Sequence, residues 1–160
     1  MPALFLRRAT EADIPFVMET ERKPGYEKTL GRFEHDRHAT LLADPSWIYL
    51  VAPPHGIALF NEVDEPQKNI CLKRFAVSER GAGYGSQLLP AALDFAFTET
   101  DAHRVWLRLV EKNEAALALY RKFGFVEEGM AREAGIAPDG SRFSFIVMSI
   151  LRPEWASRRG

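Results

Sequence analysis

The chain has 160 residues, of which 46% are hydrophobic and 27% charged, and its formal net charge is −1. This length and composition predict one folded domain over residues 1–160 and exclude a disordered chain, and the near-neutral charge gives no overall attraction to nucleic acid or to an anionic membrane. No apolar run approaches the roughly 20 residues of a membrane span, and the single cysteine, Cys71, excludes a disulfide framework or a cysteine zinc site, so we expect a cytoplasmic protein.

Hydrophobic periodicity and turn signals predict both strands and helices in the first half of the chain. Thr10, followed by Glu11 and Asp13, is typical of a helix start, and Lys23-Pro24-Gly25 is a break after that helix. The expected elements are a strand at 4–7, a helix at 10–21, one surface helix or two short ones within 27–43, and an antiparallel meander of strands at 47–52, 57–63 and 70–77.

The second half continues with mixed elements and contains no internal repeat and no linker. Apolar residues alternate at Val105, Leu107 and Leu109, which predicts a strand, and Gly124 is placed to end a helix. The expected elements are a helix at about 83–98, a strand at 104–110, a helix at 113–122, a strand from 125 to about 132, and a last strand near 143–150 after a turn at 138–140.

A glycine-rich turn joins the last strand of the meander to the helix that follows it. Gly81, Gly83 and Gly85 let the backbone take unusual dihedral angles and bring N–H groups close to a ligand, and the start of the helix adds partial positive charge. The turn therefore predicts an anion site. No lysine follows Gly85, as a P-loop requires, and Ser86 stands where a dinucleotide fingerprint has its third glycine; a turn that only starts a helix is the third alternative.

A second cluster lies on the helix predicted at 113–122. Asn113 and Tyr120 are seven residues apart, which is two helical turns, so both side chains can lie along one side of this helix. Taken with Arg80-Gly-Ala-Gly83-Tyr-Gly85 and the trailing Phe123-Gly124-Phe125, this pair resembles the GNAT superfamily of acetyl-CoA-dependent N-acetyltransferases.

The resemblance covers roughly residues 70–152 closely, and the first 45 residues match in pattern only. Within the superfamily, residues 105–155 look most like the branch of RimJ/RimL-type peptide N-terminal acetyltransferases and the polyamine acetylases. The resemblance implies an α/β (α+β) fold with a central, mainly antiparallel, splayed sheet of about seven strands and about four flanking helices. It also implies an acyltransferase that uses acetyl-CoA as cosubstrate without a metal, and related enzymes often assemble as homodimers or larger homo-oligomers.

The resemblance further implies where the coenzyme lies. Backbone groups of Phe75, Ala76 and Val77 would hold the pantetheine arm like an extra strand. Asn113 would contact the coenzyme near this arm, and Tyr120 would face the sulfur. The N–H groups that would hold the pyrophosphate belong to Arg80, Gly81, Ala82, Gly83, Tyr84, Gly85 and Ser86.

The residue types fit direct attack of a neutral amine on a thioester, in which backbone donors stabilise the oxyanion and a thiolate leaves. Because the reference pKa is about 10 for tyrosine and about 8.5 for a thiol, full proton transfer from Tyr120 is uphill, and we assign it as either a general acid or a hydrogen-bond donor to the thiolate. Plainer interpretations stay open: Asn113 caps a helix, Tyr120 packs on the sheet, and Arg80 is a solvated loop cation.

The general base is not apparent from the sequence. Familiar peptide N-terminal acetyltransferases of this superfamily have a glutamate five residues before the motif asparagine, and Arg108 stands at that position here. Glu62 and Glu111 are the candidate bases, acting directly or through water, although either can equally be a surface carboxylate. The four histidines are scattered along the chain, so we predict no metal site.

A weak base favours an acceptor that is already partly neutral. Near neutral pH an α-amine with a pKa of about 7.7–8.0 is roughly a quarter neutral, whereas a lysine-like amine near 10.4 is neutral about once in a thousand. We therefore expect a peptide N-terminus or an amino-acid-like α-amine as the acceptor. A polyamine or another small-molecule amine, such as an antibiotic, is the alternative acceptor, and a non-catalytic acyl-CoA-binding sensor or interaction module is the alternative of another class.

Overall fold

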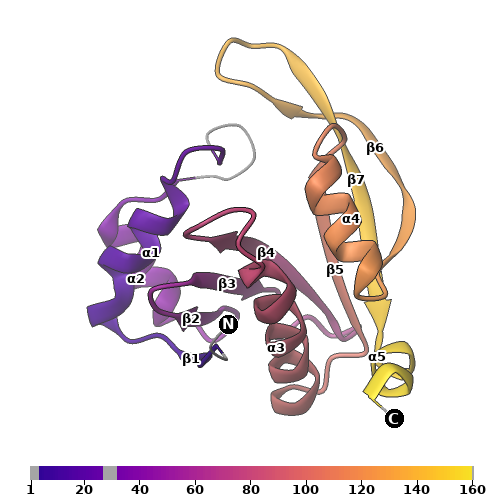
Figure 1. Cartoon of the computed structure of the whole chain (residues 1–160), viewed down its shortest axis with the longest axis horizontal. Coiled ribbons are helices and arrows are strands. Elements are labelled where there is room, and N and C mark those ends of the chain that lie inside the picture. The colour runs from indigo at the N-terminus through magenta and orange to yellow at the C-terminus, as the bar shows by residue number, and fades with distance from the viewer. Residues whose placement is uncertain (1–3, 27–31, 160) are drawn as a thin grey trace.

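The computed structural model describes residues 4–26 and 32–159, and it shows a seven-stranded mixed sheet with helices on both faces (Figure 1). The strands lie in the order β1-β2-β3-β4-β5-β7-β6, and every neighbouring pair is antiparallel except β4 and β5. The strands are β1 (Arg7–Arg8), β2 (Ile48–Ala52), β3 (Gly56–Asn61), β4 (Asn69–Val77), β5 (Arg104–Val110), β6 (Val126–Ile136) and β7 (Arg142–Leu151). The predicted fold class is confirmed.

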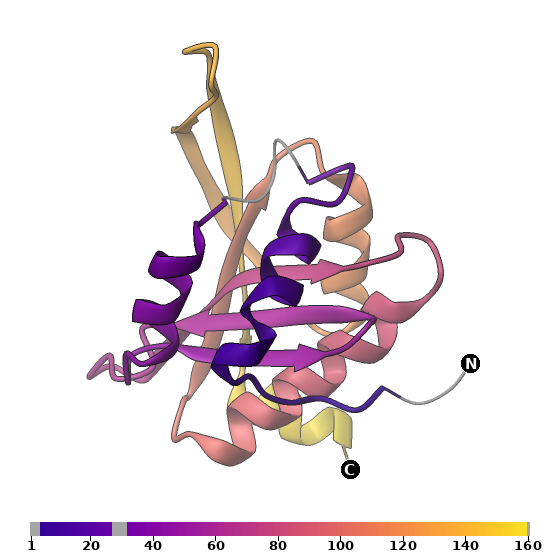
Figure 2. The same ribbon diagram turned by 90° about the vertical axis from the view of Figure 1, so that its left-hand side faces the viewer.

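Five α-helices lie within the described ranges, one more than expected. They are α1 (Ile14–Glu21), which follows a short 3-10 turn at Glu11–Asp13, α2 (His35–Leu42), α3 (Tyr84–Glu99), α4 (Glu114–Lys122) and α5 (Arg152–Arg159). Figure 2 shows α1 lying across one face of β2, β3 and β4. None of these helices is long and apolar enough to cross a membrane.

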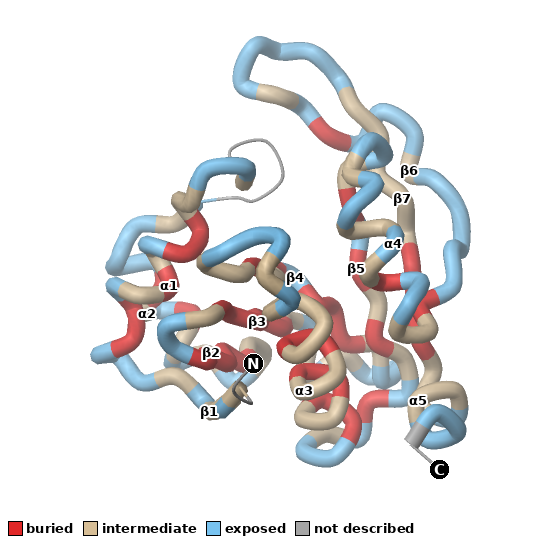
Figure 3. Tube along the Cα trace, viewed as in Figure 1, coloured by how far each residue is buried: buried red, intermediate tan, exposed pale blue. Residues whose placement is uncertain are grey.

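The core has two parts because the central strands are covered on both faces. On β2, Ile48 and Leu50 pack with the residues of α3, whereas Tyr49 and Val51 pack with α1 and α2. Alternate side chains of a strand point to opposite faces, and a strand buried on both faces is nearly all apolar. Figure 3 shows this buried band through β2 and β3.

The sheet splays open between β4 and β5. These two strands pair only where Asn69–Cys71 meets Arg104–Trp106, and their carboxyl-terminal parts diverge (Figure 1). One arm of the sheet is formed by β1 to β4 and the other by β5 to β7. The divergence leaves the last residues of β4 without a partner strand on this side, so their backbone groups are available to other partners.

Three of the expected elements differ in extent from the observed ones. The strand expected at 4–7 is limited to β1, and the strand expected to end near 132 continues to Ile136 with two register shifts. Within 32–43 the helical segment begins at His35, because the chain is extended at Glu34 and Phe33 lies over the Arg74 guanidinium. Residues 27–31 lie outside the described ranges.

The sequence reasoning did not predict α5. Only one large apolar side chain of this helix, Trp155, packs on the core; it stacks on Phe97 with ring centroids 5.1 Å apart, and its Nε1–H donates to Asp94. At the start of α5, the Arg152 guanidinium donates to three backbone carbonyls at and just after the end of α3. These carbonyls have no partner inside α3, so α5 acts as its carboxyl-terminal cap.

Candidate active site

A cleft of about 360 Å³ lies where β4 and β5 diverge. Its walls come from the end of β4, the glycine turn, the first turn of α3, the end of β5, and α4, and Tyr26 closes one side. The cations among its lining residues are Lys73, Arg80 and Arg108, and no described lining residue is an aspartate or a glutamate. A cleft with this charge suits a polyanionic ligand.

Two of the three glycines in the turn have the unusual dihedral angles that the sequence predicted, whereas Gly85 lies within α3 and has no positive φ. Gly81 and Gly83 have φ angles of 81° and 87°, in the left-handed region that L-residues with side chains rarely adopt. Gly83 is also the N-cap residue of α3 and provides no side-chain cap, so the first N–H groups of that helix stay available to a ligand. The Lys122 ammonium, which donates to the Ser86 hydroxyl, adds positive charge beside the turn.

Gly85 serves a different purpose, because it lies where α3 and α4 approach each other. A Cβ atom at this position would lie 3.3 Å from a methyl group of Leu119. This distance is shorter than ordinary van der Waals contact, so a side chain at position 85 would require the Leu119 methyl group to shift by a few tenths of an ångström. Gly85 therefore allows a close contact between α3 and the Leu119 side chain of α4.

Helix α4 brings Asn113 and Tyr120 to the same cleft. The Asn113 side chain accepts a hydrogen bond from the Ala116 N–H at 3.2 Å, so Asn113 is the N-cap of α4, as its plainer interpretation holds. Glu114 in the first turn and Arg121 and Lys122 in the last turn complement the helix dipole. Both Asn113 and Tyr120 line the cleft.

Tyr120 is buried between two aromatic rings. It meets Phe75 and Phe125 edge to face, with centroid distances of 6.2 and 5.5 Å. Burial raises the pKa of the Tyr120 hydroxyl above its ordinary value. The hydroxyl is therefore neutral at physiological pH and able to donate a hydrogen bond.

The other predicted coenzyme residues divide into two groups. Those that line the cleft are Phe75, Val77, Arg80, Gly81, Gly83, Gly85 and Ser86. Ala76, Ala82 and Tyr84 do not line it: Ala76 is buried in the core beside α1 and α2, and the Tyr84 ring stacks on His55. These three were expected to act through backbone groups, and that expectation stays a prediction.

The two candidate bases lie away from the cleft wall. Glu62 follows β3 directly, is exposed, and has a φ of 58°. Glu111 is exposed in the turn after β5, and its N–H donates to the Ser144 carbonyl. Their role as bases stays a prediction. Arg108, in the position of the expected glutamate, does line the cleft, and its guanidinium carbon lies 4.2 Å from the Phe145 ring centroid.

Cys71 has no part in this site as a nucleophile. It is buried, and burial raises the pKa of its thiol to about 12, so the reactive thiolate is not formed near neutral pH. Within the described ranges, no group of three or more His, Cys, Asp and Glu side chains is arranged to hold a metal ion.

Tyr26 is a cleft residue that sequence reasoning missed. Its hydroxyl accepts a hydrogen bond from the Val77 N–H at 3.0 Å and lies 3.3 Å from the Val77 carbonyl, to which it donates. The only local signal was the Lys23-Pro24-Gly25 sequence, which indicated the end of a helix and nothing more. Long-range contacts of this kind leave no trace in local periodicity.

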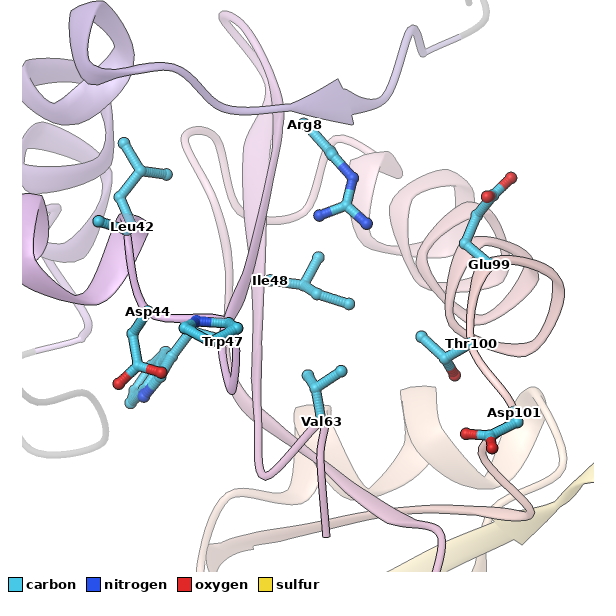
Figure 4. Close-up of a pocket in the computed structure, with 11 residues that line it drawn as sticks. Arg8, Leu42, Asp44, Trp47, Ile48, Val63, Glu99, Thr100 and Asp101 are labelled. Atoms are coloured by element: carbon cyan, nitrogen blue, oxygen red, sulfur yellow. The ribbon is translucent and has the colours of Figure 1, made fainter.

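A second hollow, of about 510 Å³, lies between the start of β2 and the end of α3 (Figure 4). Figure 4 shows the Arg8 side chain pointing into it from β1. None of the predicted site residues lines this hollow, and two of its carboxylates are occupied: Asp101 pairs with Lys68 at 2.9 Å, and Asp44 accepts from Ser46. This hollow is therefore a weaker candidate for the active site than the cleft between β4 and β5, although its volume is larger.

Several known proteins that are similar to this chain are acetyltransferases. Residues 13–125 match the model of the acetyltransferase (GNAT) family. The chain is 37% identical over 75 residues to a spermine/spermidine N(1)-acetyltransferase of Bacillus subtilis, covering 44% of this chain and 49% of that protein. It is 31% identical over 105 residues to a putative ribosomal N-acetyltransferase of the same organism, covering 65% and 57%.

A spermidine N(1)-acetyltransferase of Vibrio cholerae is 39% identical over 54 residues, which are 34% of this chain and 31% of that protein. The matches thus span between about a third and three fifths of these curated relatives. A solved structure of spermidine N-acetyltransferase from Vibrio cholerae with CoA and spermine has a TM-score of 0.85 at 21% identity and covers 96% of this chain and 98% of that one. At this identity, the likeness establishes the fold.

The expected RimJ/RimL-type branch stays a prediction, because the polyamine acetyltransferases match at higher identity than the ribosomal relative. The family itself is established by a model that spans most of the chain, including β4, the glycine turn and α4. The chain belongs to the acetyltransferase (GNAT) family.

Proposed function

We propose that the protein is an N-acetyltransferase that moves the acetyl group of acetyl-CoA to a primary amine, with a polyamine such as spermidine or spermine as the acceptor. The observation that carries the proposal is the cleft between β4 and β5, where the glycine turn, Asn113 and Tyr120 meet. The names of the relatives from Bacillus subtilis and Vibrio cholerae support the polyamine acceptor.

The cleft offers each part of the coenzyme a suitable partner. N–H groups of the glycine turn and the start of α3 can hold the pyrophosphate, with Arg80 and Lys122 adding charge. The unpaired side of β4 at Phe75–Val77 can hold the amides of the pantetheine arm, as an added strand does. This arrangement directs the arm toward the Tyr120 ring.

Acetyl-CoA supplies a thioester; attack of a neutral amine on its carbonyl carbon forms the C–N bond, the C–S bond breaks, and the proton that the amine nitrogen loses passes to the departing thiolate, directly or through water. Tyr120 donates a hydrogen bond to the sulfur as negative charge develops there. Its buried position strengthens this interaction, because the surroundings contain little water to compete. Backbone N–H groups of β4 stabilise the oxyanion in the same way.

A second acceptor class is favoured by one observation. Lys73 and Arg108 line the cleft, and no described carboxylate lines it to attract a polycation. An α-amine next to a carboxylate, as in an amino acid, would pair its carboxylate with one of these cations. Such an amine is also more often neutral near pH 7 than a polyamine nitrogen is.

One assay compares the candidates. Free thiol released from acetyl-CoA is measured with spermidine, spermine, free amino acids and short peptides, in the wild type and in Arg108→Met. The proposal predicts release with the polyamines and equal or faster release in Arg108→Met, because repulsion of the acceptor is reduced. Release with carboxylate-bearing α-amines alone, lost in Arg108→Met, would establish the second class.

The alternative of another class is a sensor that binds the coenzyme without turnover. Tight binding of CoA, measured by calorimetry, together with no acceptor-dependent thiol release across the amine panel would favour the sensor and contradict the enzyme. The assay is run at pH 8 with a tenfold excess of each amine, so that protonation of the acceptor does not by itself cause a lack of thiol release.

A further inference from the structure

The edge of β4 that faces the cleft is contacted by the segment that follows α1. Tyr26 bonds both backbone groups of Val77, at 3.0 Å to the N–H and 3.3 Å to the carbonyl. One residue earlier, the Gly25 carbonyl accepts a hydrogen bond from the Arg80 guanidinium at 3.2 Å. Gly25 and Tyr26, which follow α1, therefore contact the last residue of β4, Val77, and the first residue of the glycine turn, Arg80.

The backbone conformation at position 25 favours glycine, and the end of the flexible Arg80 side chain lies close to it. Gly25 has a φ of 100°, and a Cβ atom there would lie 2.2 Å from Nη1 of Arg80. The Arg80 guanidinium carbon lies 5.1 Å from the centroid of the Tyr26 ring, in cation–π geometry. Pro24 precedes Gly25 and supplies the fixed φ of a turn. The contact thus combines the Gly25 carbonyl, the Tyr26 ring and the Arg80 guanidinium.

The groups that Gly25 and Tyr26 occupy are those that the proposed coenzyme site needs. The Val77 N–H and carbonyl are the strand-like partners of the pantetheine arm, and Arg80 belongs to the turn that faces the pyrophosphate. A single N–H makes one good hydrogen bond, so the Tyr26 hydroxyl and a pantetheine carbonyl cannot both hold the Val77 N–H. The Tyr26 ring also lines the cleft itself.

We propose that Gly25–Tyr26 is an autoinhibitory plug, a built-in competitor that occupies the coenzyme site in the free protein and is displaced when the coenzyme binds. This inference rests on the proposed coenzyme site. The plug reduces the apparent coenzyme affinity by the fraction of molecules in which it is open. It also keeps the unpaired β4 edge from pairing with other strands while the site is empty.

Removing the Tyr26 hydroxyl tests the plug directly. In Tyr26→Phe both hydrogen bonds to Val77 are lost and the ring remains, so CoA should bind about five- to thirtyfold more tightly, as measured by calorimetry with CoA as the probe. Gly25→Ala touches different atoms and should change affinity in the same direction. Thr40→Ala, which removes a hydroxyl bonded only within α2, is the control and should leave CoA affinity unchanged.

Thermal unfolding of the same variants gives a second readout. The contact exists only without coenzyme, so Tyr26→Phe should lower Tm in the free protein and leave Tm at saturating CoA nearly unchanged. Unchanged or weaker CoA binding in Tyr26→Phe, or an equal loss of Tm with and without CoA, would overturn the plug. A wild type that does not bind CoA at all would overturn the coenzyme site itself, which separates that failure from a failure of the plug.

Discussion

The cleft between β4 and β5 and the layer of α1 and α2 behind β4 hold their polar groups in opposite ways. The cleft presents backbone N–H groups and a few cations to a ligand. Behind β4, four buried side chains bond one another instead: His38 joins Glu21 to Tyr49, with 2.7 Å between its Nδ1 and the Tyr49 hydroxyl, and Glu21 lies 3.6 Å from the Arg74 guanidinium.

This second group forms a buried polar network in which Glu21 Oε2 and Arg74 Nη1 form an ion pair but no hydrogen bond within the described residues. Arg74 is 5% exposed and Glu21 is fully buried, so each charge depends on its partners for solvation. Burial lowers the pKa of the Arg74 guanidinium, and the carboxylate of Glu21 opposes this shift. The Arg74 charge is also covered by the Phe33 ring, 3.8 Å from its centroid. The comparison predicts that changes in the network alter stability, whereas changes in the cleft alter binding.

The largest expected effect tests the network. Glu21→Gln leaves the buried Arg74 charge without its counter-charge and should reduce the free energy of unfolding by about 3 kcal/mol, measured by urea denaturation. Glu19→Gln is the matched control on the same helix: Glu19 is 68% exposed and pairs with Lys23 on the surface, so its loss should cost less than about 0.5 kcal/mol.

If the cleft and the buried network behind β4 act independently, the folded Glu21→Gln protein keeps its CoA affinity. A large loss of CoA binding under conditions where the variant is still folded would mean that the two regions are coupled through β4. Equal destabilisation by Glu21→Gln and Glu19→Gln would show that the network contributes no more than a surface ion pair.

The next largest effect concerns the glycine turn. Gly83→Val places a β-branched side chain at a φ of 87° in the cleft and should weaken CoA binding by about thirtyfold. Gly140→Val is the control, because Gly140 has a φ of 86°, a Cβ there would meet nothing within 4 Å, and the residue lies in the turn between β6 and β7. Both variants carry the same backbone strain, and only Gly83→Val should lose affinity.

The smallest effect concerns catalysis alone. Tyr120→Phe keeps the ring between Phe75 and Phe125 and should reduce turnover by about tenfold while CoA affinity stays nearly unchanged. Because burial raises the pKa of this hydroxyl, the tyrosine stays a donor through pH 9, and the loss should be equal from pH 7 to pH 9. Wild-type turnover in Tyr120→Phe would remove Tyr120 from the reaction.

The parts of the molecule that were predictable are those that short sequence segments determine. The strand β5 follows from alternation, the strands of the meander follow from apolar runs bounded by turn signals, and the end of α4 follows from Gly124, whose φ is 98°. The glycine turn and the Asn113–Tyr120 pair each lie within a single loop or helix, and the resemblance to the GNAT superfamily assigned both to one coenzyme site. Backbone donors in a turn leave a glycine pattern that can be recognised.

The remaining parts depend on contacts between distant segments. The plug joins Gly25 and Tyr26 to Val77 and Arg80. The buried polar network joins side chains of α1, α2, β2 and β4. In α5, one stacked tryptophan and one capping arginine replace the apolar stripe that periodicity detects. Such side-chain pairs become visible only when the fold has brought the segments together.

A crystal structure of the protein with CoA bound tests the central claim most directly, because it shows which groups hold each part of the coenzyme. We expect the pyrophosphate to bind the N–H groups of residues 80–86 and the pantetheine arm to lie beside Phe75–Val77. The sulfur should lie next to the Tyr120 hydroxyl, and the Tyr26 hydroxyl should lie away from Val77. Coenzyme bound outside the cleft between β4 and β5, or in it with its sulfur far from Tyr120, would contradict the account.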